Sequence, residues 1–362
     1  MDKIEIMQQL LQLENRDVVQ KWFYKIHNRK LNSIRTKEIN SAAKQSSEFF
    51  RNAELANYTV RPLLTYYGIS TLSRALILLL RPNSGENSLI AGHGLQTMNW
   101  SNILSGNDIG KSLKNIGQLE VKTCKGLFSE LINETKNRIS IHVNSGGVDW
   151  RLGYDIPNVG FSFTLNDLIS RIPDLNLDLK NLEIEEKYCS VNEMSFSYES
   201  GFHCKVNSQF ESIKHTFEEL GYTTINSNQI YELNCSSEIF TNNLPLFLHK
   251  YVNKMFGSIP VLHIVQPFDG KNYYSEIALT FLLSYYLGML VRYFPTHWNS
   301  LVQGENGDIY WTVLNRAQNY VETVYPELVI ELISDILKEK DILIQRAHCF
   351  TGNGTLTFPV CF

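Results

Sequence analysis

Cationic and aromatic side chains between residues 61 and 94 could together bind an anion. His93 lies between two glycines, which let the backbone approach a neighbour or a ligand closely. Arg61 and Arg74 lie at the start of, or within, an otherwise apolar segment, where a guanidinium needs a partner. With Tyr67 they would form a site for a small ligand or a nucleotide. The favoured alternative is structural: ion pairs for the two arginines and a backbone hydrogen bond for His93.

A second pair, Arg292 and His297, has the R-x4-H spacing of HEPN-type ribonucleases. In that mechanism the histidine is a general acid or base, and the arginine stabilises the charge of the phosphorane within a dimer. The position at the end of an apolar segment fits this motif. Pro295 interrupts it, however, and Tyr293 stands where a polar residue is typical. The alternative is that Arg292 caps one helix and His297 begins the next.

Two further patterns come close to known phosphate or metal chemistry. Residues Ser105 to Ser112 are one residue short of a Walker A loop, with Ser105 in place of the first glycine. Asp174, Glu185 and Lys187 have the spacing of a PD-ExK nuclease, in which acidic groups hold a metal and lysine assists the attacking water. The strands that such sites need are not evident. We therefore favour a polar loop and a solvated strand edge.

The six cysteines show no CxxC spacing. Because the chain is long and begins with charged residues where a signal peptide would be apolar, free thiols are expected. The adjacent pairs His203-Cys204 and His348-Cys349 cannot each chelate a metal, because neighbouring residues of a strand point to opposite faces. The sequence predicts no metal site and no cofactor.

The composition favours a soluble, cytoplasmic protein. Hydrophobic residues make up 43% of the 362 residues and charged residues 19%, which suits a chain with a sizeable core. The net charge of −4 speaks against duplex DNA as a partner, while RNA stays open. The most apolar stretch, Leu63 to Leu80, contains Ser73 and Arg74, so we expect a buried core helix and no membrane span.

The elements that position these residues are expected to be mainly helices. Apolar side chains at helical spacing predict a helix over residues 4–13 and another over residues 18–26, the second capped by Asp17. Two longer helices, from Leu63 to Leu80 and from Glu276 to Tyr293, are apolar nearly all round, which is typical of central helices.

Short strands and a last helix complete the predicted order. Alternating apolar residues predict strands at Ile139–Val143, within Glu183–Val206 and at Gln229–Leu233. Pro326 is predicted to open a final helix that ends at Lys340, because proline is tolerated in the first turn.

The predicted fold class is α+β, with a predominantly helical core and a small antiparallel β insertion in the middle of the chain. The two apolar helices are expected to pack together although they lie far apart in the sequence. Residues 1–160 would form the N-terminal helical part and residues 161–260 a mixed α/β insertion. Residues 261–362 would form the C-terminal helical part that packs back on the N-terminal helices.

Four short segments, in the same order along the chain, resemble the YaaC-like family. They are Arg61–Gly68 (RPLLTYYG), His93–Leu95 (HGL), Arg171–Leu175 (RIPDL) and Met289–Pro295 (MLVRYFP). The resemblance touches most of the chain and implies a helical fold and a bacterial or phage origin. It implies no particular activity, cofactor or catalytic residue.

Three functions follow as hypotheses. The favoured one is an accessory protein that acts through a protein partner or as a homo-oligomer, in a bacterial defence or stress module, and it should show an exposed apolar patch. The first alternative is a metal-independent HEPN-like ribonuclease, with Arg292 and His297 facing one open cleft. The second alternative is a small-ligand or nucleotide sensor, with Arg61, Arg74 and His93 converging on a polar pocket.

Overall fold

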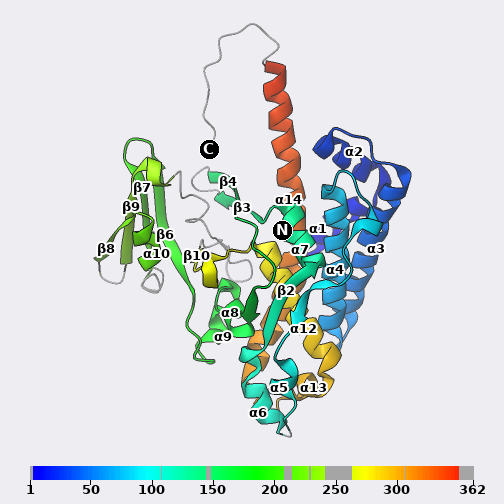
Figure 1. Ribbon diagram of the computed structural model, residues 1–362, viewed down its shortest axis with the longest axis vertical. Coiled ribbons are helices and arrows are strands. Elements are labelled where there is room, and N and C mark those ends of the chain that lie inside the picture. Colours follow the sequence, from blue (N-terminus) through cyan, green and yellow to red (C-terminus); the bar gives the residue numbers. More distant parts are fainter. Residues whose placement is uncertain are drawn as a thin grey trace.

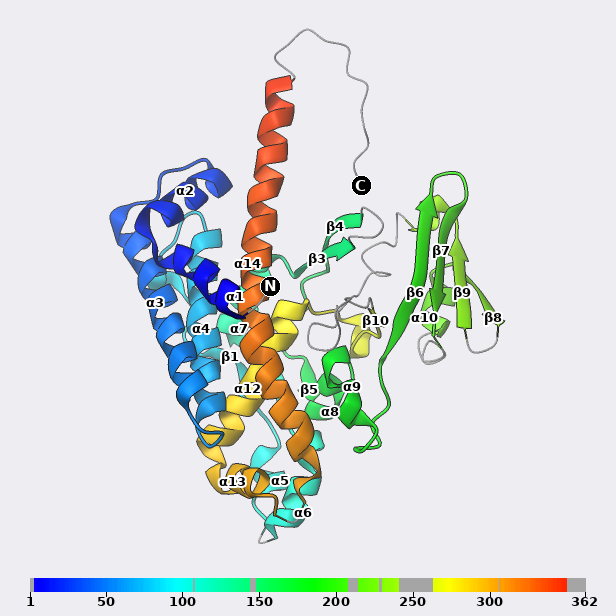
Figure 2. The ribbon, with the colours of Figure 1, turned by 180° about the vertical axis from the view of Figure 1, so that it is seen from behind.

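The computed structural model describes residues 3–106, 108–143, 148–207, 214–227, 230–240, 263–305 and 307–349. A helical body forms most of the described structure, and a β lobe lies at one side of it (Figure 1, Figure 2). The predicted α+β class, dominated by helices and with small antiparallel sheets, is confirmed.

The described helices are α1 (Lys3–Leu10), α2 (Arg16–His27), α3 (Ser33–Leu55), α4 (Arg61–Leu80), α5 (Trp100–Leu104), α6 (Ile109–Lys114), α7 (Leu127–Thr135), α8 (Leu165–Ile169), α9 (Asn176–Leu179), α10 (Lys214–Glu219), α12 (Glu276–Tyr293), α13 (Pro295–Gln303) and α14 (Trp311–Cys349). The described strands are β1 (His93–Thr97), β2 (Glu120–Gly126), β3 (Arg138–Val143), β4 (Val148–Gly153), β5 (Ser162–Thr164), β6 (Tyr188–Ser197), β7 (Gly201–Val206), β8 (Thr223–Ser227), β9 (Ile230–Cys235) and β10 (His263–Val265).

The two apolar helices, α4 and α12, form the centre of the body and pack against each other, as predicted. Their contact is close because α12 meets α4 at a glycine. A Cβ atom on Gly288 would lie 2.8 Å from Cβ of Tyr66. The long helix α14 runs beside both (Figure 2). Ser73 of α4 and Tyr325 of α14 share a buried hydrogen bond of 2.5 Å.

The strands β1, β2 and β5 form an antiparallel sheet that packs against α12. Tyr286 of α12 lies with its hydroxyl 2.7 Å from the carbonyl oxygen of Phe163 in β5. The register of β1 shifts between His93 and Leu95, where Gly94 has a φ of 76°. A Cβ atom on Gly94 would lie 2.7 Å from the backbone nitrogen of Phe128, so the chain approaches α7 too closely for any other residue.

The β lobe is a five-stranded antiparallel sheet with the strand order β10-β6-β7-β9-β8. Its inner face and α10 enclose a cluster of buried side chains that is separate from the core of the helical body. Phe202 stacks on Phe240 in this cluster, with 4.2 Å between ring centroids. The core of the helical body includes residues from α1 to α14 and also Leu165 to Leu179 of α8 and α9.

Two local sequence predictions are wrong. Asn15, not Asp17, caps α2, because the Asn15 side chain accepts hydrogen bonds from the backbone nitrogens of Asp17 and Val18. Pro326 lies inside α14 and does not open a helix. Tyr325 and Val329 on either side of it are fully buried, and this packing offsets the roughly 3 kcal/mol that a proline costs inside a helix.

Among the described helices, α4 is long and apolar enough to cross a membrane, with a mean hydropathy of 1.5. Helices α12 and α13 together pass the same test, although they bend by 104° at their junction. The core helix of a soluble protein passes this test too, and 67% of the α4 window is buried inside the body. Among the cysteines whose side chains the structure describes, Cys124, Cys189, Cys204 and Cys235 are free thiols.

Candidate functional site

Three of the residues that the sequence singles out lie together at one end of the contact between α4 and α12. They are Tyr67 of α4, His93 of β1 and Arg292 in the last turn of α12. The close packing of α4 on α12 brings Tyr67 to Arg292, and the bulge in β1 turns His93 towards α4. The sequence assigned these residues to two different hypothetical sites, and the fold combines them in one.

His93 is half-buried and is held by Tyr66, the neighbour of Tyr67 on α4. The Tyr66 hydroxyl and the His93 Nδ1 atom lie 2.6 Å apart. Burial raises the pKa of Tyr66, so its hydroxyl stays protonated and can donate to Nδ1. Burial also lowers the pKa of His93, and the nearby positive charge of Arg292 lowers it further. The imidazole is therefore kept neutral near pH 7.

Arg292 is exposed, and within the described part of the chain it donates one hydrogen bond, to the neutral hydroxyl of Tyr67. Its Nη1 atom donates to the Tyr67 hydroxyl at 3.1 Å, and its guanidinium carbon lies 5.1 Å from the ring centroid of Tyr293. The ring of Tyr285 lies 5.9 Å from that of His93, and burial raises the pKa of Tyr285 to about 12. The result is a surface cluster of aromatic rings around one cation and one neutral imidazole.

The other two predicted ligand residues, Arg61 and Arg74, belong to separate ion pairs. Arg61 donates to both carboxylate oxygens of Glu322 in α14, with distances of 2.8 and 3.1 Å. Arg74 pairs with Glu86 at 2.5 Å on a partly exposed surface. Each of these two arginines already has a carboxylate partner, so the ion-pair interpretation fits them better than a ligand-binding role.

His297 is not at the surface where Arg292 lies. It is in the first turn of α13, after the 104° bend that follows α12, and its side chain is only 9% exposed. The ring packs on Phe294 at 6.1 Å between centroids, and its Nε2 atom is buried without a hydrogen-bond partner among the described residues. This arrangement favours a packing role for His297, and the ribonuclease hypothesis stays a prediction.

The loop that resembles a Walker A motif lines an open cavity of about 600 Å³. The segment before it is the helix α5, and α6 after it has only six residues. A phosphate-binding loop needs a buried strand before it, so the polar-loop interpretation fits better. Asp108 caps α6 through the backbone nitrogen of Lys111.

The residues with PD-ExK spacing do not form a metal centre either. Asp174 is buried in a short 3-10 helix, and Lys187 donates to Asp167 at 3.3 Å. No group of three or more metal-binding side chains occurs within the described residues.

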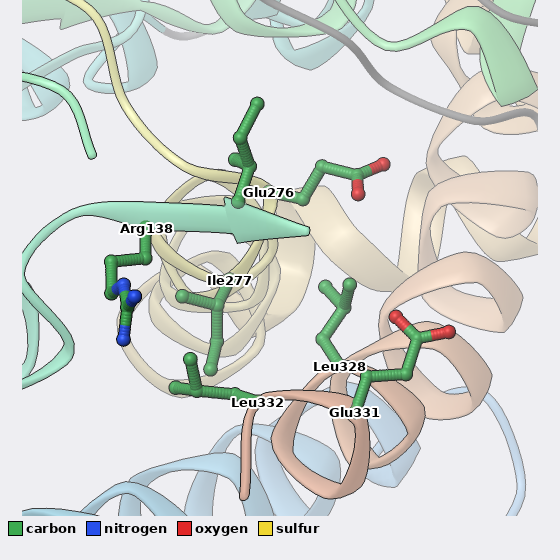
Figure 3. Close-up of a pocket in the computed structure, with 7 residues that line it drawn as sticks. Arg138, Glu276, Ile277, Leu328, Glu331 and Leu332 are labelled. Carbon is green, nitrogen blue, oxygen red and sulfur yellow. The ribbon is translucent and has the colours of Figure 1, made fainter. Parts of the chain in front are cut away.

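Figure 3 shows a small cavity where β3, α12 and α14 meet. Its volume is about 30 Å³, which holds little more than a water molecule. Arg138 at its edge pairs with Glu339 of α14 at 2.5 Å, and Glu276 and Glu331 project near it (Figure 3). This cavity is too small for an organic ligand and instead marks the junction of three elements.

One more surface, the outer edge of the β lobe, was not predicted from the sequence. The strand β8 is the last in its sheet, so one side of its backbone faces away from β9. Ile225 of β8 is 53% exposed, and Ile230 at the start of β9 is 40% exposed. Ile225 is paired with Glu232, so Ile230, two residues before Glu232, lies diagonal to Ile225 on the same face.

Fold and surface together define a helix-dominated α+β protein. It carries a surface cluster of arginine, histidine and tyrosine, and a β lobe whose last strand, β8, pairs with no second strand among the described residues. The chain belongs to the YaaC-like protein family, whose model matches residues 11–333. This match includes all four segments on which the resemblance was based. No curated protein and no solved structure matches the chain.

Proposed function

We propose that the protein is an interaction protein that binds its partner by strand addition at β8. The observation that carries the proposal is the open edge of this strand beside the exposed isoleucines Ile225 and Ile230. An accessory protein was expected to show such an apolar patch. Its setting, the bacterial cytoplasm and a defence or stress module, is part of the proposal and is supported only by the composition and the family.

The sequence of β8 lacks the features that normally protect an edge strand. Natural edge strands carry lysine, proline or a bulge, because unpaired backbone groups otherwise recruit another strand. The strand from Thr223 to Ser227 reads TTINS, with no charge and no proline, and its pairing with β9 has no register shift. Threonine and isoleucine also favour extended backbone. The edge is therefore competent to pair with a further strand.

A second copy of the same chain is the partner that this edge fits best. In an antiparallel pair centred on Ile225, the two Ile225 side chains would face each other, and Thr224 would face Asn226. No like charges would meet in this pairing, whereas a charged strand would repel its own copy. One five-residue strand pair is a small contact, so we expect a weak dimer that forms as the concentration rises.

The test is the molar mass of the full chain by sedimentation velocity across a wide concentration range. Wild type should shift from monomer to dimer, and Ile225→Lys should stay monomeric, because two lysines would meet at the centre of the pair. The control is Ile34→Lys on α3, which changes a residue that is 70% exposed and distant from the β lobe. This control should dimerise as wild type does.

Two results would contradict the proposal. One is a wild-type protein that stays monomeric at every concentration. The other is an Ile225→Lys variant that associates as strongly as wild type, because the dimer would then use another surface.

A further inference from the structure

Arg292 differs from the other arginines that the folded elements hold in place. Seven of those lie within ion-pair distance of a carboxylate, namely Arg51, Arg61, Arg74, Arg81, Arg138, Arg171 and Arg316. Arg292 donates instead to the neutral hydroxyl of Tyr67, and no carboxylate lies within ion-pair distance of it in the described part of the chain. Its charge is thus uncompensated and faces water.

His93 adds a second polar group to the same surface. Its Nδ1 atom is occupied by the Tyr66 hydroxyl, so the proton of the neutral ring belongs on Nε2. No residue of the described chain bonds to that Nε2 atom. The ring of Tyr66 lies 5.5 Å from that of His93 and 5.9 Å from that of Tyr67, whose hydroxyl accepts the hydrogen bond from Arg292, so Tyr66 links His93 to the arginine. Two hydrogen-bond donors, the Arg292 guanidinium and the His93 Nε2–H, therefore lie in one neighbourhood with no acidic partner among the described residues.

The Tyr67 hydroxyl supplies a third donor. It accepts its hydrogen bond from Arg292, so its own proton remains available. Both tyrosines come from one turn of α4. This helix packs closely on α12 at Gly288 and is joined to α14 by the Ser73–Tyr325 hydrogen bond. The aromatic rings are thus fixed in place before any ligand arrives, and a fixed site loses less entropy on binding.

We propose that Arg292, Tyr67 and His93 form a binding site for the phosphate group of a small phosphorylated ligand. A guanidinium offers two parallel N–H donors that match two oxygens of a phosphate. The Tyr67 hydroxyl and the His93 Nε2–H can each donate to a further oxygen. The site lies at the surface and outside the cavities described above, so it recognises the phosphate group more than the rest of the ligand.

Binding at this site should strengthen as the pH falls. The titratable groups around His93 are Tyr66 on α4, Tyr285 and Arg292 on α12, and Cys124 on β2. Glu130 on α7, which also packs on β1, is already engaged by Arg81 and the backbone of Ile90. A bound dianion would offset the Arg292 charge and favour a protonated His93, so protonation and anion binding help each other.

The experiment measures binding of inorganic phosphate to the full chain by isothermal titration calorimetry, with chloride used to hold the ionic strength constant. Arg292→Gln should weaken binding at least about tenfold, a difference of about 1.4 kcal/mol. Arg292→Lys should retain part of the phosphate affinity, because lysine keeps the positive charge and lacks the two parallel N–H donors of the guanidinium. The control is Arg74→Gln, which removes an exposed but ion-paired arginine and should have no effect.

Two further arms distinguish this site from its alternatives. Inorganic phosphate takes up a proton in this pH range, so the pH dependence is measured with sulfate, which stays a dianion. His93→Gln should then reduce the increase in affinity between about pH 7.5 and 6, since that increase depends on the imidazole. Single-stranded RNA serves as the phosphodiester probe. Tight RNA binding that Arg292→Gln abolishes, without measurable phosphate binding, would overturn the proposal in favour of a nucleic-acid surface. Phosphate binding that is equal in wild type and Arg292→Gln would overturn it as well.

This site is independent of the proposed strand addition. Ile225→Lys changes the β lobe and should leave phosphate binding unchanged, whereas Arg292→Gln should leave the molar mass unchanged. The two proposals can therefore fail separately.

Discussion

At the scale of residues, the position of a side chain in the fold decides whether the same chemical group is structural or available. Arg61 and Arg292 are both arginines at an end of a central helix. Arg61 faces Glu322, whose side chain is only 3% exposed, and the hydrogen bonds that Arg61 donates to this carboxylate raise the pKa of Arg61. Removing one partner of such a pair leaves a buried charge, so Arg61 fixes α4 to α14. Arg292 has no such partner among the described residues, which leaves its charge available for the proposed ligand.

The buried histidine His297 should make the protein less stable in mild acid. Burial lowers its pKa from 6.5, so the unfolded chain binds a proton more readily than the folded one. Full stability is therefore present above about pH 6.5 and is lost as the pH falls through the lower folded pKa. In thermal unfolding, His297→Leu should show a smaller drop in Tm between about pH 7.5 and 5.5 than wild type.

The control for this prediction is His215→Leu on α10, where the side chain is 85% exposed. It should leave the pH dependence of Tm unchanged, because water reaches the ring in the folded protein. An unchanged pH dependence in His297→Leu would show that other groups control it. Burial also lowers the pKa of His27 and His93, so part of the acid sensitivity should remain in that variant.

At the scale of elements, the contact between α4 and α12 holds the helical body together and positions the phosphate-binding cluster. Gly288 is the closest point of this contact. Gly288→Ala would place a methyl group 2.8 Å from Cβ of Tyr66, a distance that forces the helices apart. The expected loss of stability is about 1–3 kcal/mol in urea unfolding, in spite of the roughly 1 kcal/mol that alanine contributes to a helix.

Gly68→Ala is the matched control in α4. Its new methyl group would meet the ring of Phe50 at 3.2 Å, and a ring at that distance can shift by a few tenths of an ångström. We expect a much smaller change in the free energy of unfolding than for Gly288→Ala. Equal losses in the two variants would mean that the 2.8 Å contact does not limit the approach of the helices.

At the scale of the whole molecule, the helical body and most of the β lobe have separate hydrophobic clusters, while Tyr188 of β6 and Val265 of β10 belong to the cluster of the body. A defect in the lobe should therefore remain local. Phe202→Ala removes a ring that is 1% exposed and stacked on Phe240, which should cost the lobe about 3–5 kcal/mol. Hydrogen exchange should accelerate in β6, β7 and β9, while amides of α4 and α12 keep their protection.

Tryptophan fluorescence provides the control for this prediction. Trp100 and Trp298 are buried in the core of the helical body, so their unfolding midpoint reports on that core. It should not move in Phe202→Ala. A shift of this midpoint together with the exchange rates would show that body and lobe unfold as one unit.

The sequence by itself determined the elements with strong periodic signals and the fold class. The stretches Leu63–Leu80 and Glu276–Tyr293 are apolar on every side, so burial was their only stable arrangement, and they form α4 and α12 at nearly the predicted bounds. Four short segments were also enough to indicate the family. The division of the chain into three parts, with boundaries at residues 160 and 260, stays a prediction.

Local patterns failed where a distant contact outweighed them. The local sequence around Pro326 indicates the start of a helix. In the structure Pro326 lies inside α14, because its neighbours Tyr325 and Leu328 are buried in the core of the body. The edge of β8 could not be predicted, because a strand becomes an edge only through the order in which strands pair.

The candidate site depended on tertiary structure for the same reason. Arg292 and Tyr67 are separated by 225 positions, and Arg61 and Glu322 by 261. Residue types and spacing could select these arginines, because a cation beside apolar residues needs a partner. Which partner each one receives follows from how α4, α12 and α14 pack. That packing gave Arg61 a carboxylate and left Arg292 with a hydroxyl.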